Sequence, residues 1–313
     1  MPIARAEAFA PASMGNVGVA FDIMGLAFRE PGDIVCVEWD DAPGVVIAAI
    51  EGDDGCLPRD PQKNSASVAA ASVLKQLGVA RGVRLTLRKN LPLASGLGSS
   101  AASAVAAAVA VNALCGAPLS RAELLPACLD GEAAVSGYHV DNVGPSLIGG
   151  ITLITGIEFD NIFRLPVPEN LHFALVTPDV AVPTAKARAV LPSHVPLREL
   201  VAQTGAVARL VDALHHGDLE ALAAAMESDR IIEPARAHLI PMLSDARAAA
   251  KRAGALGLVI SGAGPTLCAV CDAPQVAQRV AAALGAVYDA VGIDNTTRHT
   301  RVCPDGARVL SVA

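Results

Sequence analysis

The 313-residue sequence is poor in aromatic residues and has no cluster of positive charge. Aromatic residues make up 3% of it and hydrophobic residues 52%, so Ala, Val, Leu and Ile must form most of the core. The formal net charge is −7, and no run of Lys and Arg is present, which argues against nucleic acid as a partner. An anionic ligand would therefore have to be bound by a local site.

The sequence also has little that would direct it to a membrane or to secretion. Arg5 and Glu7 interrupt the apolar stretch that a signal peptide needs, and no apolar run of about 18 residues free of polar residues follows. The seven cysteines are an odd number scattered along the chain. We therefore expect a reduced, cytoplasmic protein that does not contact a membrane.

One cysteine pair has the C-x-x-C spacing. Cys268 and Cys271 lie in the run TLCAVC, which is typical of a strand. No second cysteine pair and no nearby histidine accompany them, so we do not expect a zinc or redox site there.

The stretch from Leu91 to Ser103 (LPLASGLGSSAAS) is the most informative part of the sequence. Gly96 and Gly98 permit positive φ and a close approach of the backbone to a ligand. The alanine-rich run 101–114 has no Gly or Pro and predicts a helix. A helix start offers free N–H groups and partial positive charge, so the stretch predicts a phosphate-binding loop.

Two simpler interpretations of this stretch remain open from its own residues. The glycines can form only a turn, and Ser99 or Ser100 can serve only as the N-cap of a buried helix. The sequence does not match the P-loop pattern, and the signatures of protein kinases are absent from the chain.

The remaining pattern predicts an α+β protein in two domains, 1–170 and 171–313, with the boundary near Leu171. Strands are expected at 3–9, 33–39, 45–50, 83–88, 151–154, 173–176 and 307–312, and a strand, a glycine turn and a strand across 255–270. Residues 33–39 and 45–50 are expected to pair as a hairpin. Helices are expected at 64–77, 101–114, 121–135, 198–216, 218–228, 246–253 and 274–284.

The helix predicted at 121–135 has further local signals. Ser120 and Glu123 have the spacing of a capping box at its start. Pro126 and Gly131 lie inside it and allow a kink or a break. Glu132 near its end opposes the helix dipole, and a solvated side chain is the usual role of such a glutamate.

Several polar residues lie in surroundings that favour ligand contact. Asn16 and Asp22 lie in a glycine-spaced apolar segment, where turn formation is the alternative role. His139, Asp141 and Asn142 lie between glycines and a proline in residues 137–150, which we interpret as a rigid loop of the kind that carries function.

Two arginines complete this set of candidates. Arg188 lies one helical turn beyond Thr184 on the same face, and Arg236 lies inside the apolar segment 231–241. A second glycine turn, in ISGAGPT at 260–266, can form a tight hairpin or approach an anion.

Three glycine-bearing segments resemble, in order and spacing, the three motifs of the GHMP kinase superfamily. They are APASMGNVGVAFD at 10–22, PLASGLGSSAAS at 92–103 and ISGAGPT at 260–266. Three further segments resemble the homoserine kinase family within it, namely HVDNVGPSLIGG at 139–150, PTAKARAVLP at 183–192 and IEPARAHLIP at 232–241. The resemblance covers nearly the whole chain.

The resemblance implies a two-domain fold, with an N-terminal domain like ribosomal protein S5 and a ferredoxin-like C-terminal domain. It implies ATP-dependent phosphorylation of the side-chain hydroxyl of L-homoserine, with Mg²⁺, in threonine biosynthesis. The expected small-molecule partners are homoserine and ATP, and the expected assembly is a homodimer.

The resemblance also assigns roles to residues of this sequence. Mg²⁺ would be held by Ser100 and Glu132. Homoserine contacts fall to Asn16, Asp22, His139, Asn142, Arg188 and Arg236, and the catalytic group comprises Asn142, Arg188, Ser100 and Glu132. The phosphate loop that binds ATP comprises Pro92, Leu93, Ala94, Ser95, Gly96, Leu97, Gly98, Ser99, Ser100, Ala101 and Ala102.

Other readings remain open at this point. One is a different GHMP kinase, such as a mevalonate kinase, whose substrate has no ammonium group. Another is a non-catalytic amino-acid or nucleotide sensor on the same scaffold, although a sensor does not need a metal-binding pair. Whether Asp141 acts as a base is undecided. We favour Asn142, because adjacent residues in an extended loop point to opposite sides.

Overall fold

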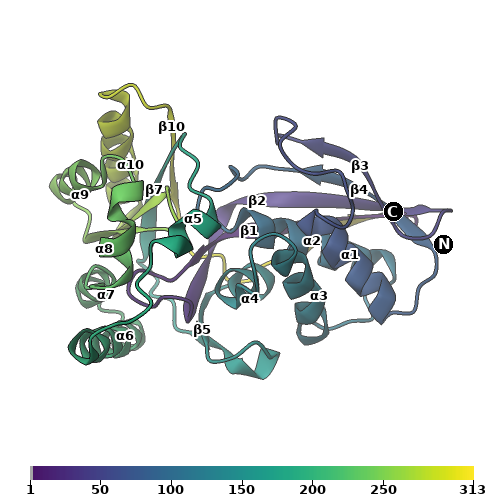
Figure 1. The fold of residues 1–313 in the computed structure, drawn as a ribbon, viewed down its shortest axis with the longest axis horizontal. Helices are drawn as coiled ribbons and strands as arrows, with labels where there is room; N and C mark the ends of the chain where they lie inside the picture. The colour runs from purple at the N-terminus through teal and green to yellow at the C-terminus, as the bar shows by residue number, and fades with distance from the viewer. Residues whose placement is uncertain (1–2) are drawn as a thin grey trace.

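A computed structural model describes residues 3–313 and has two units arranged along its longest axis (Figure 1). The first unit is a mixed sheet covered by four helices. The second is a smaller antiparallel sheet with the remaining helices packed around it. The α+β class predicted from the sequence is confirmed.

The first sheet has seven strands among the described residues, and its main path runs β11-β1-β2-β4-β3. A branch leaves β2, which also pairs with β5, and β5 in turn pairs with β6. The strands are β1 (Arg5–Gly15), β2 (Met24–Asp40), β3 (Val45–Glu51), β4 (Gly82–Arg88), β5 (Ile151–Ile154), β6 (Ile162–Leu165) and β11 (Arg308–Val312).

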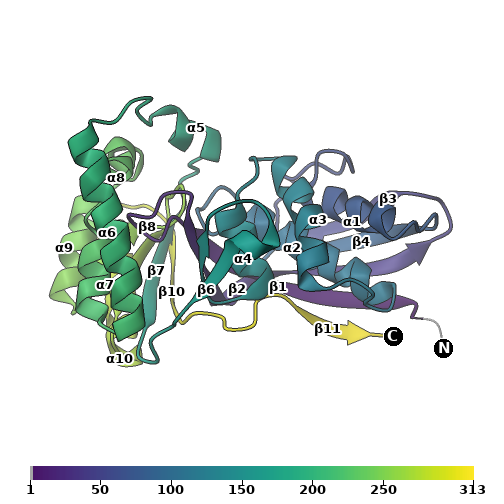
Figure 2. The ribbon, with the colours of Figure 1, turned by 90° about the horizontal axis from the view of Figure 1, so that it is seen from below.

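Four helices pack on this sheet and on one another, with α2 in contact with both β1 and β2. They are α1 (Ser65–Gln76), α2 (Ser99–Leu114), α3 (Arg121–Ala133) and α4 (Val140–Ile148). Figures 1 and 2 show them gathered on one side of the long strands β1 and β2.

The second sheet runs β10-β7-β9-β8 and is antiparallel throughout. Its strands are β7 (His172–Pro178), β8 (Gly257–Ile260), β9 (Leu267–Cys271) and β10 (Asn295–Thr300). The helices of this unit are α5 (Thr184–Ala189), α6 (Leu197–His216), α7 (Leu219–Met226), α8 (Ile232–Arg236), α9 (Leu243–Arg252) and α10 (Pro274–Asp289). Short 3₁₀ turns cover Phe159–Asn161 and Ala237–Leu239.

Helix α2 forms the centre of the larger core. Every residue from Ala101 to Leu114 is buried, because α1, α3, α4, β1 and β2 surround the helix. Alanine side chains permit this close packing on all sides and explain why the helix has no polar face. A Cβ on Gly131 would lie 2.8 Å from the Cβ of Ala104, so the glycine lets α3 approach α2. Helix α3 continues through Pro126 and Gly131 without a break, and its capping box is confirmed.

The hairpin expected from residues 33–39 and 45–50 is wrong. Strand β4 lies between β2 and β3, and β3 pairs with β4 in parallel. Parallel neighbours need a crossover connection, and α1 provides it between β3 and β4. The helix after residue 64 was predicted correctly. It was the feature of the sequence that indicated a parallel pairing of β3 with β4.

Two predicted loops are shorter than expected. In the glycine-spaced segment that carries Asn16 and Asp22, strand β1 does not end at Phe9 but continues to Gly15, and β2 already begins at Met24, so the loop is confined to residues 16–23. The expected loop 137–150 contains helix α4, with His139 as its N-cap residue. Strands β6 and β10 were not predicted, and β10 has the polar sequence NTTRHT.

The end of the chain returns to the first unit. The predicted boundary near Leu171 falls in the connection from β6 to β7, but β11 pairs with β1 in the first sheet. The N–H of Ala4 donates to the carbonyl of Ala313 at 2.7 Å, so both ends lie side by side, as Figure 2 shows.

The described residues 3–313 also bear on membrane spans and on the cysteines. Among them, no helix combines the length and apolar character needed to cross a membrane. All seven cysteines are free, and Cys268 and Cys271 are buried in β9, the strand expected for them.

Candidate active site

The glycine loop before α2 has the backbone geometry of an anion cradle. Gly96 has φ +78° and Gly98 has φ +60°, and Gly98 is the N-cap of α2. The N–H groups of Ser99 and Ser100 precede the first intrahelical hydrogen bond, which Ala102 donates to Gly98. Neither serine caps the helix, so the simple N-cap interpretation is wrong. A Cβ on Gly98 would lie 2.0 Å from Ser13 Oγ, so only glycine fits there.

The three glycine-bearing segments, far apart in sequence, meet at this loop. The N–H of Ser13 donates to the carbonyl of Leu97 at 3.1 Å. Ser261 Oγ donates to the carbonyl of Gly96 at 2.7 Å, and Asn16 Nδ2 donates to the carbonyl of Gly262 at 2.9 Å. The third segment therefore packs against the glycine loop, and its Gly262 and Ala263 line the same cavity as the loop rather than a separate one.

A buried ion pair fixes the base of the loop. Lys89, at the end of β4, pairs with Asp33 of β2, and both side chains are almost fully buried. Lys89 Nζ also donates to Ser99 Oγ at 2.7 Å and to Ser103 Oγ at 2.8 Å, both in the first turns of α2. Asp33 accepts further hydrogen bonds from Ser103 Oγ and from the N–H of Asn90. The pair is thus fully satisfied and joins two strands to the helix that starts the loop.

A cavity of about 570 Å³ opens in front of the loop, between the two units. Most of the residues predicted to bind ligands line it: Asn16, Asp22, Leu93, Ala94, Ser95, Gly96, Gly98, Ser99, Ser100, Glu132, His139, Asp141, Asn142, Arg188 and Arg236.

Four residues of the predicted ATP loop do not line the cavity. The side chains of Leu97, Ala101 and Ala102 are buried in the core, and Pro92 borders a separate hollow. Ala101 and Ala102 lie in the first turn of α2 and are buried there, whereas Leu97 is buried in the loop before the helix. Their side chains are therefore unsuited to ligand contact, and only their backbone groups remain as candidates.

The first turn of α4 brings Asp141 and Asn142 to the same side. Both line the cavity, and Asn142 Nδ2 lies 3.5 Å from Asp141 Oδ1. The expectation that they would point to opposite sides of an extended loop is wrong, because residues 140–148 are helical. Asn142 Oδ1 accepts from Ser13 Oγ at 3.1 Å and would lie 3.0 Å from a Cβ on Gly98, so Asn142 lies beside the glycine loop.

Asp141 is buried in an unusual electrostatic environment. Loss of solvent is the main cause that raises its pKa from 3.8 to about 7, and the negative charge of Asp22 raises it further. The positive charge of Arg188 and the N–H of Asn16 lower the pKa in part. The Asp141 carboxyl group is therefore protonated more easily than that of an exposed aspartate.

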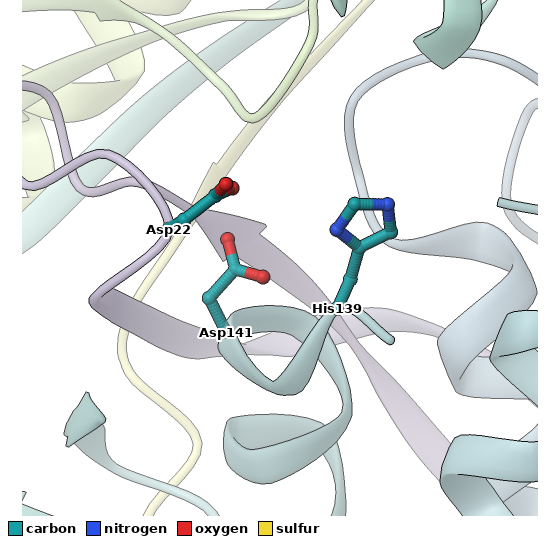
Figure 3. A group of neighbouring side chains, drawn as sticks. All are labelled: Asp22, His139 and Asp141. Carbon is teal, nitrogen blue, oxygen red and sulfur yellow. The ribbon is translucent and has the colours of Figure 1, made fainter. Parts of the chain in front are cut away.

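Asp22, His139 and Asp141 come together from two segments, and Figure 3 shows the two carboxylates facing each other with the imidazole opposite. One ligand atom of each lies within 4.8 Å of the others. A metal is a poor occupant, however, because Arg188 reaches into the group. It contacts Asp22 through two hydrogen bonds of 2.7 and 3.1 Å and His139 Nδ1 at 3.1 Å. Because His139 Nε2 contacts the carbonyl of Ser136 at 2.8 Å, we assign it the ring proton.

Arg236 is a buried cation without an acidic partner. It is 3% exposed, and among the described residues its guanidinium donates only to the carbonyls of Ala187 and Gly262, each at 3.1 Å. Among residues 3–313 no carboxylate oxygen lies within 4.0 Å of it. Burial is the main cause that lowers its pKa, and the charge of Arg188 adds to this. An unpaired buried arginine is costly, which favours an anionic ligand at this position.

Phe21 supports both arginines. The guanidinium carbon of Arg188 lies 5.4 Å from the centre of the Phe21 ring, and that of Arg236 lies 5.3 Å from it. The aromatic face favours cations and so holds two like charges near one another. Together with Asp22, they form a small region in which two cations and one acid face the cavity.

Glu132 has the features of a metal ligand. Its side chain is 3% exposed, and Oε1 accepts from Ser136 Oγ at 2.6 Å. Oε2 is buried without a hydrogen-bond partner among residues 3–313. Burial raises the pKa of Glu132, while the hydroxyls of Ser136 and Ser100 lower it. The solvated role usual for such a glutamate is therefore wrong here.

Several residues of the cavity were not predicted from the sequence. Lys89 and Phe21 were not singled out, and neither were Leu57, Pro58 and Asn64 at the end near α1. A lysine at the end of a strand, directly before a glycine loop, was the available signal for Lys89. Leu57 and Pro58 lie in a segment without secondary structure and gave no signal.

Comparisons with known proteins agree with this geometry. Residues 64–150 match the GHMP kinases N terminal domain, and residues 210–290 match the GHMP kinases C terminal domain. A homoserine kinase from Chloroherpeton thalassium is 40% identical over 96% of this chain and 98% of its own length.

Solved structures give the same result. A homoserine kinase from Cytophaga hutchinsonii superposes with a TM-score of 0.93 at 40% identity, over 98% of this chain and 97% of that one. The mevalonate kinase of L. major, in complex with R-mevalonate, has a TM-score of 0.71 at 19% identity over 92% of this chain and 94% of that one, which shows a shared fold alone. With its two-domain fold, its convergent glycine segments and these relatives, the chain belongs to the homoserine kinase family of the GHMP kinases.

Proposed function

We propose that the chain transfers the γ-phosphoryl group of ATP to the side-chain hydroxyl of L-homoserine, giving O-phospho-L-homoserine in threonine biosynthesis. The observation that carries this proposal is Arg236, the buried guanidinium without an acidic partner, next to Arg188 and Asp22. A zwitterionic amino acid needs cations for its carboxylate and an acid for its ammonium. This part of the cavity offers both.

The substrate enters by exchanging ion pairs. The carboxylate of homoserine accepts hydrogen bonds from the free N–H groups of Arg236. Its ammonium pairs with Asp22 and replaces Arg188, which is the partner of Asp22 in the structure. The Arg188–Asp22 pair is partly exposed, with side-chain exposures of 37% and 40%, so opening it costs little. Asn16 and His139 border the same space and complete the polar wall.

ATP lies along the glycine loop. Its phosphates contact the N–H groups at the start of α2, where the helix dipole favours negative charge. Leu57, Pro58 and Val135 give the opposite end of the cavity an apolar wall, which suits a nucleobase.

The residues present fit a magnesium ion beside the loop. Glu132 Oε2 is a buried acceptor without a partner, and the Ser100 hydroxyl lies next to this carboxylate. Oxygen donors of this kind suit Mg²⁺, which supplies positive charge to the phosphates when bound. We assign Ser100 and Glu132 to hold it.

Phosphoryl transfer needs mainly positioning and charge neutralisation. We assign Asn142 to orient the homoserine hydroxyl, because it lies between the glycine loop and Asp141. When homoserine has replaced it at Asp22, Arg188 contributes positive charge close to the phosphoryl group that is being transferred. Asp141 holds the Asn142 amide in place and has no assigned role as a base.

The test is ADP release measured with a panel of hydroxyl substrates. We expect turnover with L-homoserine and a loss of at least about a hundredfold in kcat/KM with 4-hydroxybutyrate, which lacks the ammonium that Asp22 would bind. Asp22→Asn should reduce this discrimination, whereas Asp160→Asn on an exposed 3₁₀ turn should not. Equal rates with both substrates would contradict the proposal.

The same panel addresses the alternatives. Preferred turnover of mevalonate would identify a mevalonate kinase, and binding of homoserine and ATP without ADP release would identify a sensor. Asn142→Leu should lower kcat more than Asp141→Asn does, and the reverse order would assign proton transfer to Asp141. The homodimer and the cytoplasmic location stay predictions.

A further inference from the structure

The chain crosses between the two units twice, and the crossings lie next to each other. The first connection, 166–171, leads from β6 to β7, and the second, 301–307, leads from β10 to β11. Figure 2 shows both on the side towards the lower edge of the view. Arg164 Nη2 donates to the carbonyl of Pro304 at 2.7 Å, and Arg301 Nη2 donates to the carbonyl of Glu169 at 2.5 Å. The second connection thus accepts a hydrogen bond from Arg164 of β6, and the first connection accepts one from Arg301 of the second.

A cavity of about 660 Å³ lies at these connections. Arg29, Arg164 and Arg301 line it, together with His215 at the end of α6, Glu169, and apolar residues of both connections. None of its lining residues lines the active-site cavity. It is therefore a separate hollow, to which both units contribute.

The charge in this cavity is unbalanced. Among residues 3–313, no carboxylate oxygen lies within 4.0 Å of the guanidinium of Arg29, Arg164 or Arg301. Of the described residues that line it, Glu169 is the one acidic residue. All three arginines are exposed, and together they give the hollow a net positive charge in a chain with a net charge of −7.

A neighbouring histidine reports the same positive field. The pKa of His172 at the start of β7 lies below its ordinary value, first because of partial burial and then because of the positive charges of Arg301 and His299. The nearby Asp272 raises it only in part.

We propose that this cavity is an anion-binding site, separate from the active site, for a small molecule that carries a phosphate or carboxylate group and an apolar part. Arg164 and Arg301 each use one N–H group on a carbonyl, which leaves the rest of each fork for a bidentate contact. Arg29 makes no side-chain hydrogen bond among residues 3–313, so its whole guanidinium is available. The prolines and valines of the connections meet the apolar part of the ligand.

An anion in this cavity would contact both connections at once. Arg29 of β2 and Arg164 of β6 would share one ligand with Arg301, so its binding would fix the second connection against the first sheet. The site is defined by its own charges and does not depend on the proposed reaction.

The test is a calorimetric titration of the full chain with inorganic phosphate and, separately, with citrate. The active-site cavity is first filled with a non-hydrolysable ATP analogue, which keeps the probes from the glycine loop. We expect one remaining site for at least one probe, and the tighter probe tells phosphate from carboxylate recognition. Failure of both to bind would overturn the proposal.

Variants locate the site. Arg29→Gln should weaken probe binding at least about tenfold, with no change in melting temperature, because this side chain makes no internal hydrogen bond. Arg164→Gln with Arg301→Gln should abolish binding. Arg252→Gln, an exposed change at the end of α9, is the matched control and should leave binding intact. Unchanged affinity in Arg29→Gln and in the double variant would overturn the proposal, and loss of ATP binding alone would speak only against the proposed function.

Discussion

Two groups of charges border the active-site cavity, and they differ in how completely they are paired. Behind the glycine loop, Lys89 and Asp33 are almost fully buried, and each has several further hydrogen bonds. On the substrate side, Arg188 and Asp22 form an exposed pair, and Arg236 has no acidic partner among residues 3–313. The charges of the first group are all paired within the protein. In the second group, Arg236 is available to an anion and Asp22 can exchange Arg188 for the cation of a ligand.

The comparison indicates how the site divides structural support from recognition. A buried pair holds its charges in one position, because removal of one partner leaves the other uncompensated. An exposed pair contributes little to folding, so a ligand can replace it. The charges that support the loop are thus separated from those that exchange partners.

The largest effect should come from breaking the buried pair. Lys89→Met would leave Asp33 buried without its cation, and we expect a loss of about 3–5 kcal/mol in the free energy of unfolding. Urea denaturation measures this loss. Lys75→Met, on the exposed face of α1, is the control. A loss below 1 kcal/mol would mean that water reaches Asp33 and that the pair does not fix the loop.

The next effect concerns the unpaired cation. Arg236→Leu should weaken homoserine binding by about 2–5 kcal/mol, since it removes the buried partner of the carboxylate. ATP affinity and melting temperature should remain near those of the parent protein. Calorimetry with each ligand measures both, and Arg230→Leu, an exposed neighbour, is the control. Equal loss for the two ligands would point to misfolding rather than recognition.

The third prediction uses the buried carboxyl group on the substrate side. Because burial raises the pKa of Asp141 from 3.8 to about 7, the folded state holds a proton that the unfolded chain releases. Its contribution to stability is present below pH 4 and is lost as the pH rises to 7. The full difference is at most roughly 4 kcal/mol.

Asp141→Asn removes this dependence. The melting temperature of Asp141→Asn relative to the parent should rise between pH 5 and pH 7 and then level off, as thermal unfolding in matched buffers would measure. Asp160→Asn should give a constant difference over the same range. A parallel pH dependence in parent and Asp141→Asn would mean that Asp141 stays ionised in the folded protein.

The smallest effect should come from the exposed pair. Arg188→Met should change the free energy of unfolding by less than about 1 kcal/mol, because both side chains are partly exposed. Turnover of homoserine should nevertheless fall, which steady-state kinetics would measure. A destabilisation as large as that of Lys89→Met would remove the distinction between the two groups of charges.

Local sequence signals predicted much of this architecture. The glycines at 96 and 98, the alanine run after them and the capping box at Ser120 were sufficient for the loop and two helices. Helix α4 was missed because Gly144 and Pro145 are typical of loops, and a helix of nine residues shows too little periodicity to outweigh them.

Long-range contacts were beyond local patterns. Asp33 and Lys89 are 56 residues apart, and nothing near either residue indicates the other. The position of β4 between β2 and β3 likewise depends on a crossover and not on the turn at 41–44. Motifs were sufficient to name the candidate ligand residues. They did not indicate that Arg188 pairs with Asp22, because the two residues are 166 positions apart in the sequence.

The packing around α2 limits how this enzyme can change. Its residues from Ala101 to Ala113 are all buried, and each added methylene there should cost about 1–3 kcal/mol. Substitutions along the helix are therefore confined to residues of similar size. The orientation of the first turn of α2 towards the cavity is fixed in the same way. New substrate preferences are therefore expected at the substrate end of the cavity, where the side chains of Asp22 and Arg188 are partly exposed.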